Sequence, residues 1–265
     1  MPAGGAVIAA AIRAATQRNE PAIVGFLTAG FPSREKFRTQ LAAVASAVDV
    51  VEIGVPFTDP MADGMTIQRA SHAALQAGVT LKWILSELGA LEPRPAAPLL
   101  LMSYLNPLLA FGLENLPAAA VRAGVSGFIV PDLPFEESGE LKGALGGEGP
   151  ALVQMVTPVT PADRLRKLCA ASEGFVYAVT MTGTTGKSVA VPHDVIDYLK
   201  RVRGASSIPV CAGFGIRSRE QVESLRNHVD GVIVGSALVE VLERGEDPVP
   251  FLRALRNSKT WTRGA

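Results

Sequence analysis

Residues 49–64 of the chain read DVVEIGVPFTDPMADG and join a short apolar strand to a long loop. Residues 49–54 have the valine and isoleucine content that is typical of a buried strand. The loop that follows, residues 55 to about 66, is rich in proline and carries Asp59 and Asp63. Polar groups that follow the carboxyl end of a strand are typical of α/β folds that act on small molecules.

The same order recurs along the chain, which alternates short apolar runs with longer amphipathic segments. The predicted strands are residues 22–28, 49–54, 98–103, 126–130, 151–156, 174–180, 208–212 and 231–234. The predicted helices are residues 34–46, 81–91, 114–123, 136–145, 161–171, 194–203, 219–227 and 248–257, preceded by an N-terminal amphipathic helix within residues 1–15. Near-continuous apolar runs indicate parallel strands that are buried on both faces.

Eight strands that alternate with helices predict either a closed barrel or a doubly wound sheet. The chain shows no composition break that would divide it, and its glycine-rich and polar segments follow several different strands. A doubly wound sheet would gather such segments at one switch point, whereas barrel active sites collect at the carboxyl ends of all the strands. We therefore predict a single (β/α)8 TIM-barrel domain over residues 1–265, with an extra N-terminal helix.

The composition argues against several classes of function. Lys plus Arg and Asp plus Glu each number 25, so the formal net charge is zero and no nucleic-acid partner is indicated. The two cysteines do not make a disulfide framework, and the three histidines lack ligand spacing, so no metal is expected. No apolar stretch approaches the roughly 20 residues of a membrane span. The first residues lack the early positive charge of a signal peptide, and we predict a cytoplasmic protein.

Glu52 is the first candidate for chemistry. The period of a strand places Val50, Glu52 and Gly54 on one face, so the carboxyl is expected to point into the barrel with a raised pKa. Such a group can hold and deliver a proton near neutral pH. Alternatively, Glu52 caps a loop or pairs with a buried base. Judged alone, Asp59 and Asp63 are better explained as turn residues than as catalysts, because Asp-Pro and Asp-Gly are common turn dipeptides.

A phosphate site is predicted after the last two strands. Gly213 and Gly215 follow the seventh strand, and Gly235 and Ser236 follow the eighth and open a short helical stretch at 237–242. Glycines let main-chain N–H groups approach a ligand, and a helix N-terminus favours an anion. The loops after strands seven and eight hold the phosphate in many barrels.

The loop at 181–192 contains GTTGKS at 183–188, which superficially resembles a nucleotide-binding P-loop. That motif needs a glycine five residues before Gly186, and Met181 stands there instead. We interpret the segment as a lid in which Gly186 adds one N–H to the phosphate site. Elsewhere, the sequence leaves open whether Phe26, Tyr104, Tyr177 and Asp132 line a pocket or belong to the core and rim.

Together these segments resemble the tryptophan synthase α-subunit family. The most specific match is VEIGVPFTDPMADGMTIQ at 51–68, in which Glu52 and Asp63 have the family's spacing of eleven residues. FLTAG at 26–30, YLNP at 104–107, PDLP at 131–134, the glycines of 183–186, GFGI at 213–216 and GS at 235–236 follow in family order. The resemblance covers essentially the whole chain.

The resemblance implies that the protein cleaves indole-3-glycerol phosphate to indole and glyceraldehyde 3-phosphate. Glu52 would protonate the indole ring at C3, and Asp63 would accept a hydrogen bond from the indole N–H. The pocket residues would be Phe26, Tyr104 and Tyr177, with Thr185 of the lid meeting Asp63 on closure. The phosphate ligands would be Gly186, Gly213, Gly215, Gly235 and Ser236. No cofactor is implied in this chain.

The resemblance also implies a partner. The family forms an α2β2 complex whose β subunit carries pyridoxal phosphate and condenses indole with serine to tryptophan. Asp59 and the region of the third strand would face that partner. Phe31, Met65 and Thr184 replace the family's usual aspartate, proline and valine, in loops linked to lid closure and β contact.

Three other functions are weighed against this one. Indole-glycerol-phosphate synthase would need a catalytic lysine at a strand end, and no predicted strand end has one. A non-catalytic barrel that only binds and activates a β subunit would predict a broken pair at Glu52 and Asp63, which is intact. A stand-alone indole-releasing lyase stays open.

Overall fold

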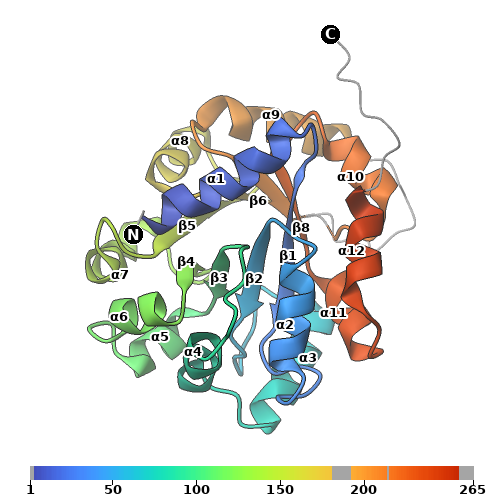
Figure 1. Cartoon of the computed structure of the whole chain (residues 1–265). Coiled ribbons are helices and arrows are strands. Elements are labelled where there is room, and N and C mark those ends of the chain that lie inside the picture. The colour runs from blue at the N-terminus through green and yellow to red at the C-terminus, as the bar shows by residue number, and fades with distance from the viewer. Residues whose placement is uncertain (1–2, 181–191, 214, 257–265) are drawn as a thin grey trace.

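The computed structural model describes residues 3–180, 192–213 and 215–256. Its strands pair in chain order, every pair is parallel, and the last strand closes on the first (Figure 1). The strands are β1 (Ala22–Thr28), β2 (Val50–Gly54), β3 (Leu99–Met102), β4 (Val125–Ile129), β5 (Ala151–Val156), β6 (Val176–Val179), β7 (Val210–Gly213) and β8 (Gly231–Val234). The predicted (β/α)8 barrel is confirmed, and the predicted strand ends differ by at most two residues.

Helices surround this barrel. They are α1 (Gly4–Gln17), α2 (Phe37–Ala45), α3 (Met65–Gln76), α4 (Leu81–Gly89), α5 (Leu105–Phe111), α6 (Leu116–Arg122), η1 (Phe135–Glu137), α7 (Gly139–Leu145), α8 (Ala162–Ala171), α9 (His193–Ala205), α10 (Arg219–Leu225), α11 (Ser236–Glu243) and α12 (Pro248–Arg256). No helix was predicted from the sequence at the positions of α3 and α5. The first turn of α5 is capped by Asp132, whose Oδ1 accepts from the N–H of Leu105 at 2.9 Å. Because this cap lies 27 residues away in the chain, the local sequence does not indicate where α5 begins. The helix predicted at 136–145 is instead split into η1 and α7 at Ser138.

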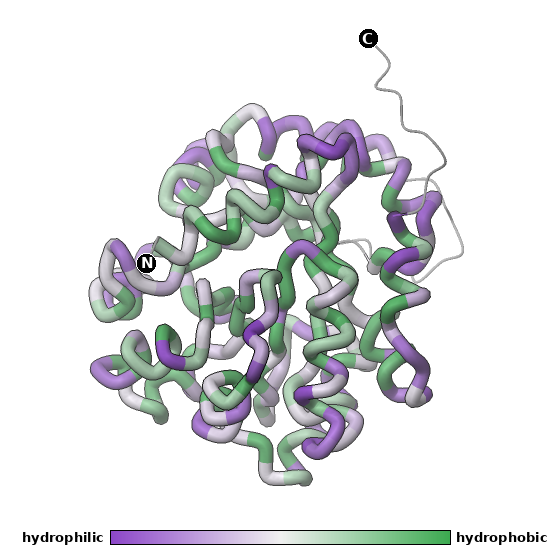
Figure 2. Tube along the Cα trace, viewed as in Figure 1, coloured by the Kyte–Doolittle hydropathy of each residue, from purple (hydrophilic) through white to green (hydrophobic). Residues whose placement is uncertain are grey.

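The barrel interior and the outer layer form separate apolar clusters. Inside, alternate strand residues such as Val24, Val50 and Leu100 meet Ile8 and Ile12 of α1, which lies across the amino ends of the strands (Figure 1). Outside, the remaining strand side chains pack against the surrounding helices. Hydrophobic segments accordingly predominate along the strands in Figure 2, while hydrophilic residues gather on the outer helices. Because the period of a strand is two, successive strand residues alternate between the barrel interior and the outer layer.

Acidic side chains hold the amino ends of neighbouring strands together. Asp49, just before β2, accepts from the N–H of Ile23 on β1 at 2.8 Å, and Asp230, just before β8, accepts from the N–H of Val210 on β7 at 2.8 Å. Asp49 also accepts from Arg256 at 2.7 Å, which ties α12 to the strands. These contacts stabilise the barrel at the end opposite the predicted site.

No described helix is long and apolar enough to span a membrane. Both cysteines, Cys169 and Cys211, are free and buried.

Candidate active site

Glu52 lies inside the barrel, as the strand period predicts. It occupies the middle of β2, beside Phe26 of β1 and Leu100 of β3 in the strand register. Only 1% of its surface is exposed, and its Oε2 has no hydrogen-bond partner among the described residues. Burial raises the pKa of Glu52 from 4.5 to about 8, with a smaller contribution from the negative charge of Asp63. A buried carboxyl with a raised pKa is typical of a functional site.

Asp63 reaches the same region from the loop after β2. Its Oδ2 accepts a hydrogen bond of 3.1 Å from the hydroxyl of Tyr104, and its main-chain oxygen accepts one of 2.8 Å from Gln68. Burial raises the pKa of Asp63 from 3.8 to about 6, and the Tyr104 hydrogen bond opposes that rise. Two neighbouring carboxyls therefore have different pKa values, which is how one site can hold an acid and an anion together.

Two aromatic rings owe their positions to glycines. Tyr177 points inward from β6, and a Cβ on Gly213 of β7 would lie 2.7 Å from its hydroxyl oxygen. A Cβ on Gly54 would lie 2.6 Å from Cζ of Phe26. Burial, and then the charges of Glu52 and Asp63, raise the pKa of Tyr177 well above its ordinary value, so its hydroxyl stays protonated beside both carboxyls.

Three of the predicted phosphate residues, Gly213, Gly215 and Gly235, lie at the carboxyl ends of β7 and β8. Gly213 pairs with Ile233 in the strand register, two residues before Gly235. Gly215 has a φ of 62°, in the left-handed region that favours glycine, and no described residue other than its chain neighbours has an atom within 4 Å of where its Cβ would be. Gly235 precedes α11, and Ser236 is the first residue of that helix. The first N–H groups of a helix have no partner within it, so they can bind an anion.

The remaining predicted residues divide into three groups. Tyr104 is buried in the site, where its ring stacks on Phe57 with 5.0 Å between the centroids. Asp132 caps α5 and Asp59 accepts from Thr58 at 2.6 Å in a local turn, so both have structural contacts. Thr185, Gly186 and the rest of 181–191 lie outside the described residues.

Several residues of the site escaped the analysis of the sequence. Gly54 shares the face of Glu52, so the strand period could have shown that it must make room for a neighbour. No local pattern in the sequence indicated Phe57 or Gln68. The ring of Phe57 stacks on Tyr104, and Gln68 donates to the main-chain oxygen of Asp63. Phe31, one of the departures, is buried against Phe26 in a small apolar cluster behind the site.

Within the described ranges, no group of three or more His, Cys, Asp or Glu side chains is arranged to hold a metal ion. The described site combines the buried carboxyls of Glu52 and Asp63, both with raised pKa values, with buried aromatic rings.

Comparison with known proteins identifies relatives of the whole chain. The profile of the "Tryptophan synthase alpha chain" family matches residues 12–259. The chain is 45% identical over 244 residues to a tryptophan synthase alpha chain of Nitratidesulfovibrio vulgaris (92% of this chain, 95% of the relative). It is 42% identical over 233 residues to one of Bacillus cereus (88% of this chain, 90% of the relative).

Solved structures show the same likeness. A structure of tryptophan synthase from M. tuberculosis superposes with a TM-score of 0.83 at 33% identity, covering 94% of this chain and 95% of that one. The tryptophan synthase subunit alpha of Legionella pneumophila superposes with a TM-score of 0.84 at 28% identity, covering 97% of both chains. On the matched residues, the identity and the shared barrel, this chain belongs to the tryptophan synthase alpha chain family.

Proposed function

We propose that this chain cleaves indole-3-glycerol phosphate into indole and glyceraldehyde 3-phosphate, as one catalytic domain. The observation that carries the proposal is the pair of buried carboxyls with separated pKa values, Glu52 near 8 and Asp63 near 6, beside a glycine-lined helix N-terminus. Each part of such a substrate would contact a different group of the barrel. The two carboxyls would contact the indole ring and its C3 carbon, and unpaired main-chain N–H groups would bind the phosphate.

Glu52 is the proton carrier in this proposal. Because its pKa is about 8, it is mostly protonated at neutral pH. It donates a proton to C3 of the indole ring, and the bond from C3 to the glycerol carbon then breaks. The hydroxyl on that carbon loses its proton as the aldehyde forms, and the Glu52 carboxylate can take it up. The substrate divides into indole and an aldehyde with no further reactant.

Asp63 supports the same step as an anion. With a pKa of about 6, it is ionised at neutral pH while Glu52 still holds its proton. Its carboxylate accepts the indole N–H and stabilises the positive charge that develops on the ring after C3 is protonated. The hydroxyl of Tyr104 donates a hydrogen bond to one oxygen of this carboxylate. Phe26 and Tyr177 are proposed to contact the flat ring.

The phosphate is assigned to Gly213, Gly215, Gly235 and Ser236, with Gly186 of the loop outside the described residues. Among the described residues, none beyond its chain neighbours occupies the space beside Gly215, and α11 begins directly after β8, where its first N–H groups can bind an anion. Thr185 is proposed to meet Asp63 when its loop closes over the substrate, which would exclude water.

Membership in the family supports a β-subunit partner for this chain. We propose that the complex has the α2β2 composition, that pyridoxal phosphate belongs to the β subunit, and that indole passes there for condensation with serine. The α reaction as written needs no cofactor, since proton transfer alone breaks the bond. The intact Glu52 and Asp63 pair argues against a barrel that only activates the β subunit.

The test is indole release from indole-3-glycerol phosphate by the purified chain, with Glu52→Ala and Asp63→Ala run beside it. Release by the parent that is lost in both variants supports the lyase and its two carboxyls. No release, even with a matched β subunit, would reject the reaction. Strong turnover that a β subunit does not change would instead favour a stand-alone lyase.

A further inference from the structure

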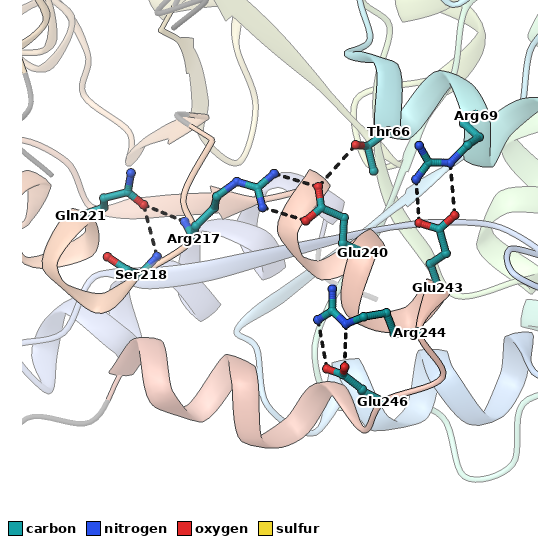
Figure 3. A network of polar contacts seen from close by, with 9 residues as sticks. All are labelled: Thr66, Arg69, Arg217, Ser218, Gln221, Glu240, Glu243, Arg244 and Glu246. Carbon is teal, nitrogen blue, oxygen red and sulfur yellow. Dashed lines mark hydrogen bonds and ion pairs between the residues drawn. The ribbon is translucent and has the colours of Figure 1, made fainter. Parts of the chain in front are cut away.

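Helix α11 is tied to two other parts of the barrel by glutamates on one of its faces (Figure 3). Both terminal nitrogens of Arg217 donate to the carboxylate of Glu240, at 2.7 and 2.8 Å. One turn later, Arg69 of α3 donates to both oxygens of Glu243, at 3.1 and 2.6 Å. Each contact is bidentate, a geometry that fixes orientation as well as distance.

The main chain of Arg217 is also hydrogen-bonded. It lies two residues after Gly215, and its N–H donates to Oε1 of Gln221 at 2.7 Å. The same oxygen accepts from Ser218 at 3.2 Å, as part of the capping box that begins α10. The side chain of Arg217 therefore links the turn after β7 to α11, while its main chain is anchored to α10.

Glu240 also reaches the segment that carries Asp63. The hydroxyl of Thr66, three residues after Asp63 in the first turn of α3, donates to Oε1 of Glu240 at 3.4 Å. Phe26, Phe31, Ala70 and Val239 form a buried apolar cluster that includes residues of β1, α3 and α11. The two helices are thus joined by apolar packing, by the Arg69–Glu243 pair and by the contact between Thr66 and Glu240.

An isolated ion pair at a surface contributes little, and the side chains of Arg217 and Glu240 are 51% and 28% exposed. This pair differs because it joins three separate segments in one network. The Arg217 hydrogen bond is the largest cause that lowers the pKa of Glu240, which keeps the carboxylate charged. Arg244 and Glu246 offer a matched comparison, since they pair at 2.6 Å near the end of α11 but lie two residues apart in the chain.

We infer that Glu240 is a positioning residue that fixes the phosphate-binding turn after β7 and the start of α11 relative to the segment of Asp63. The inference rests on the proposed function, because it assigns Glu240 a role in the binding of a phosphate-tailed substrate. A substrate that spans the site must contact Asp63 at its ring and α11 at its phosphate. A network that holds both ends at a fixed separation lowers the cost of ordering them on binding.

The experiment compares Glu240→Gln and Arg217→Ala with the parent and with Glu246→Gln. Two quantities are measured for each: the Kd for glycerol 3-phosphate, and KM and kcat for indole release. We expect both substitutions at the network to raise the Kd and KM about five- to tenfold, with kcat changed less than about threefold. The Glu246→Gln control should stay within about twofold of the parent in every value. The exchange Arg217→Glu with Glu240→Arg should recover most of the lost affinity, because an arginine at 240 can still pair with position 217.

A purely structural role would lower the folded fraction, and with it kcat, without changing the Kd of the folded molecules. The inference is overturned if Glu240→Gln and Arg217→Ala change the Kd no more than Glu246→Gln does, or if the exchange recovers nothing. A parent that binds glycerol 3-phosphate but releases no indole would reject the proposed reaction, while the Kd values would still decide the role of Glu240. A parent that binds no glycerol 3-phosphate would overturn the inference directly.

Discussion

The hydroxyl of Tyr104 makes two hydrogen bonds to the loop after β2. It donates to Oδ2 of Asp63 at 3.1 Å and accepts from the N–H of Ala62 at 2.9 Å. Burial raises the pKa of Tyr104 above its ordinary value, so the hydroxyl remains a donor throughout the working pH range. The hydrogen bond favours the ionised form of Asp63, which burial disfavours. Tyr104 thus both orients this carboxylate and preserves its charge.

Tyr104→Phe should therefore raise the pKa of Asp63 above about 6 and weaken its hold on the substrate ring. We expect the acidic limb of the pH profile of kcat/KM to move to higher pH, and kcat/KM at pH 7 to fall about tenfold, since a hydrogen bond to a charged group is worth about 1.5–3 kcal/mol. Steady-state rates of indole release across the pH range provide the measurement. An acidic limb that stays in place would contradict the role given to Tyr104.

The parent enzyme should show a bell-shaped pH profile with its maximum between about 6 and 8. Activity should fall as pH decreases through the pKa of Asp63, about 6, because that group acts as an anion. It should also fall as pH increases through the pKa of Glu52, about 8, because that group acts as an acid. The two carboxyls interact, so the limbs report the pair together. Any residual activity of Glu52→Gln should lose the alkaline limb, and an unchanged shape would reject Glu52 as the proton donor.

Glu52 should also make the parent less stable in alkaline solution. Its pKa rises from 4.5 in the unfolded chain to about 8 in the barrel, so the folded state binds its proton more tightly and loses stability as pH increases over that window. Glu52→Gln should leave the free energy of unfolding nearly unchanged at pH 4. Above pH 8 it should gain up to about 5 kcal/mol, since each pKa unit is worth about 1.4 kcal/mol. Urea unfolding at both pH values measures this, and the exposed Glu246→Gln should show no such gain. A gain that is equal at pH 4 and pH 9 would show that burial of the charge is not the cause.

Asp49 should be a main stabilising residue at the opposite end of the barrel. Its carboxylate accepts from the N–H of Ile23, from Arg256 and from Arg18, and only 10% of the side chain is exposed. Asp49→Ala should cost about 2–4 kcal/mol, because it leaves a buried N–H and the half-buried Arg256 without their partner. Arg18→Ala, at a side chain that is 52% exposed, serves as the milder comparison. Equal losses for the two variants in urea unfolding would contradict this ranking.

Two methionines that flank Asp63 should contribute to contact with the proposed β subunit. Met61 and Met65 are 83% and 84% exposed, an unusual state for large apolar side chains in a surface that has no partner. Met61→Ser with Met65→Ser should raise the β-subunit concentration needed for half-maximal activation about fivefold or more. Indole release without the β subunit should change little. Val121→Ser on α6, 39% exposed, is the control, and the same loss in that variant would reject a specific contact.

Much of the barrel could be predicted from the sequence because the deciding signals are local. Three of the eight strands have the predicted bounds, since the end of a valine- and isoleucine-rich run is visible in the chain itself. The inward position of Glu52 follows from the period of a strand, and its raised pKa follows from that burial. Gly213, Gly215 and Gly235 could be located for the same reason, because each lies at the carboxyl end of a strand or within two residues after it.

The tertiary structure alone decided which side chains act on one another. Tyr104 and Asp63 are 41 residues apart, and Arg217 and Glu240 are 23 apart, so nothing in either local sequence indicates the contact. Helix α5 was missed because Asp132, which follows a different strand, satisfies its first N–H. The sequence by itself determined the strands, the inward face of Glu52 and the glycine turns, since these depend on neighbours in the chain. The pairing of neighbouring strands decided these partners, because it brings the segment after β3 beside the loop after β2, and the turn after β7 beside α11.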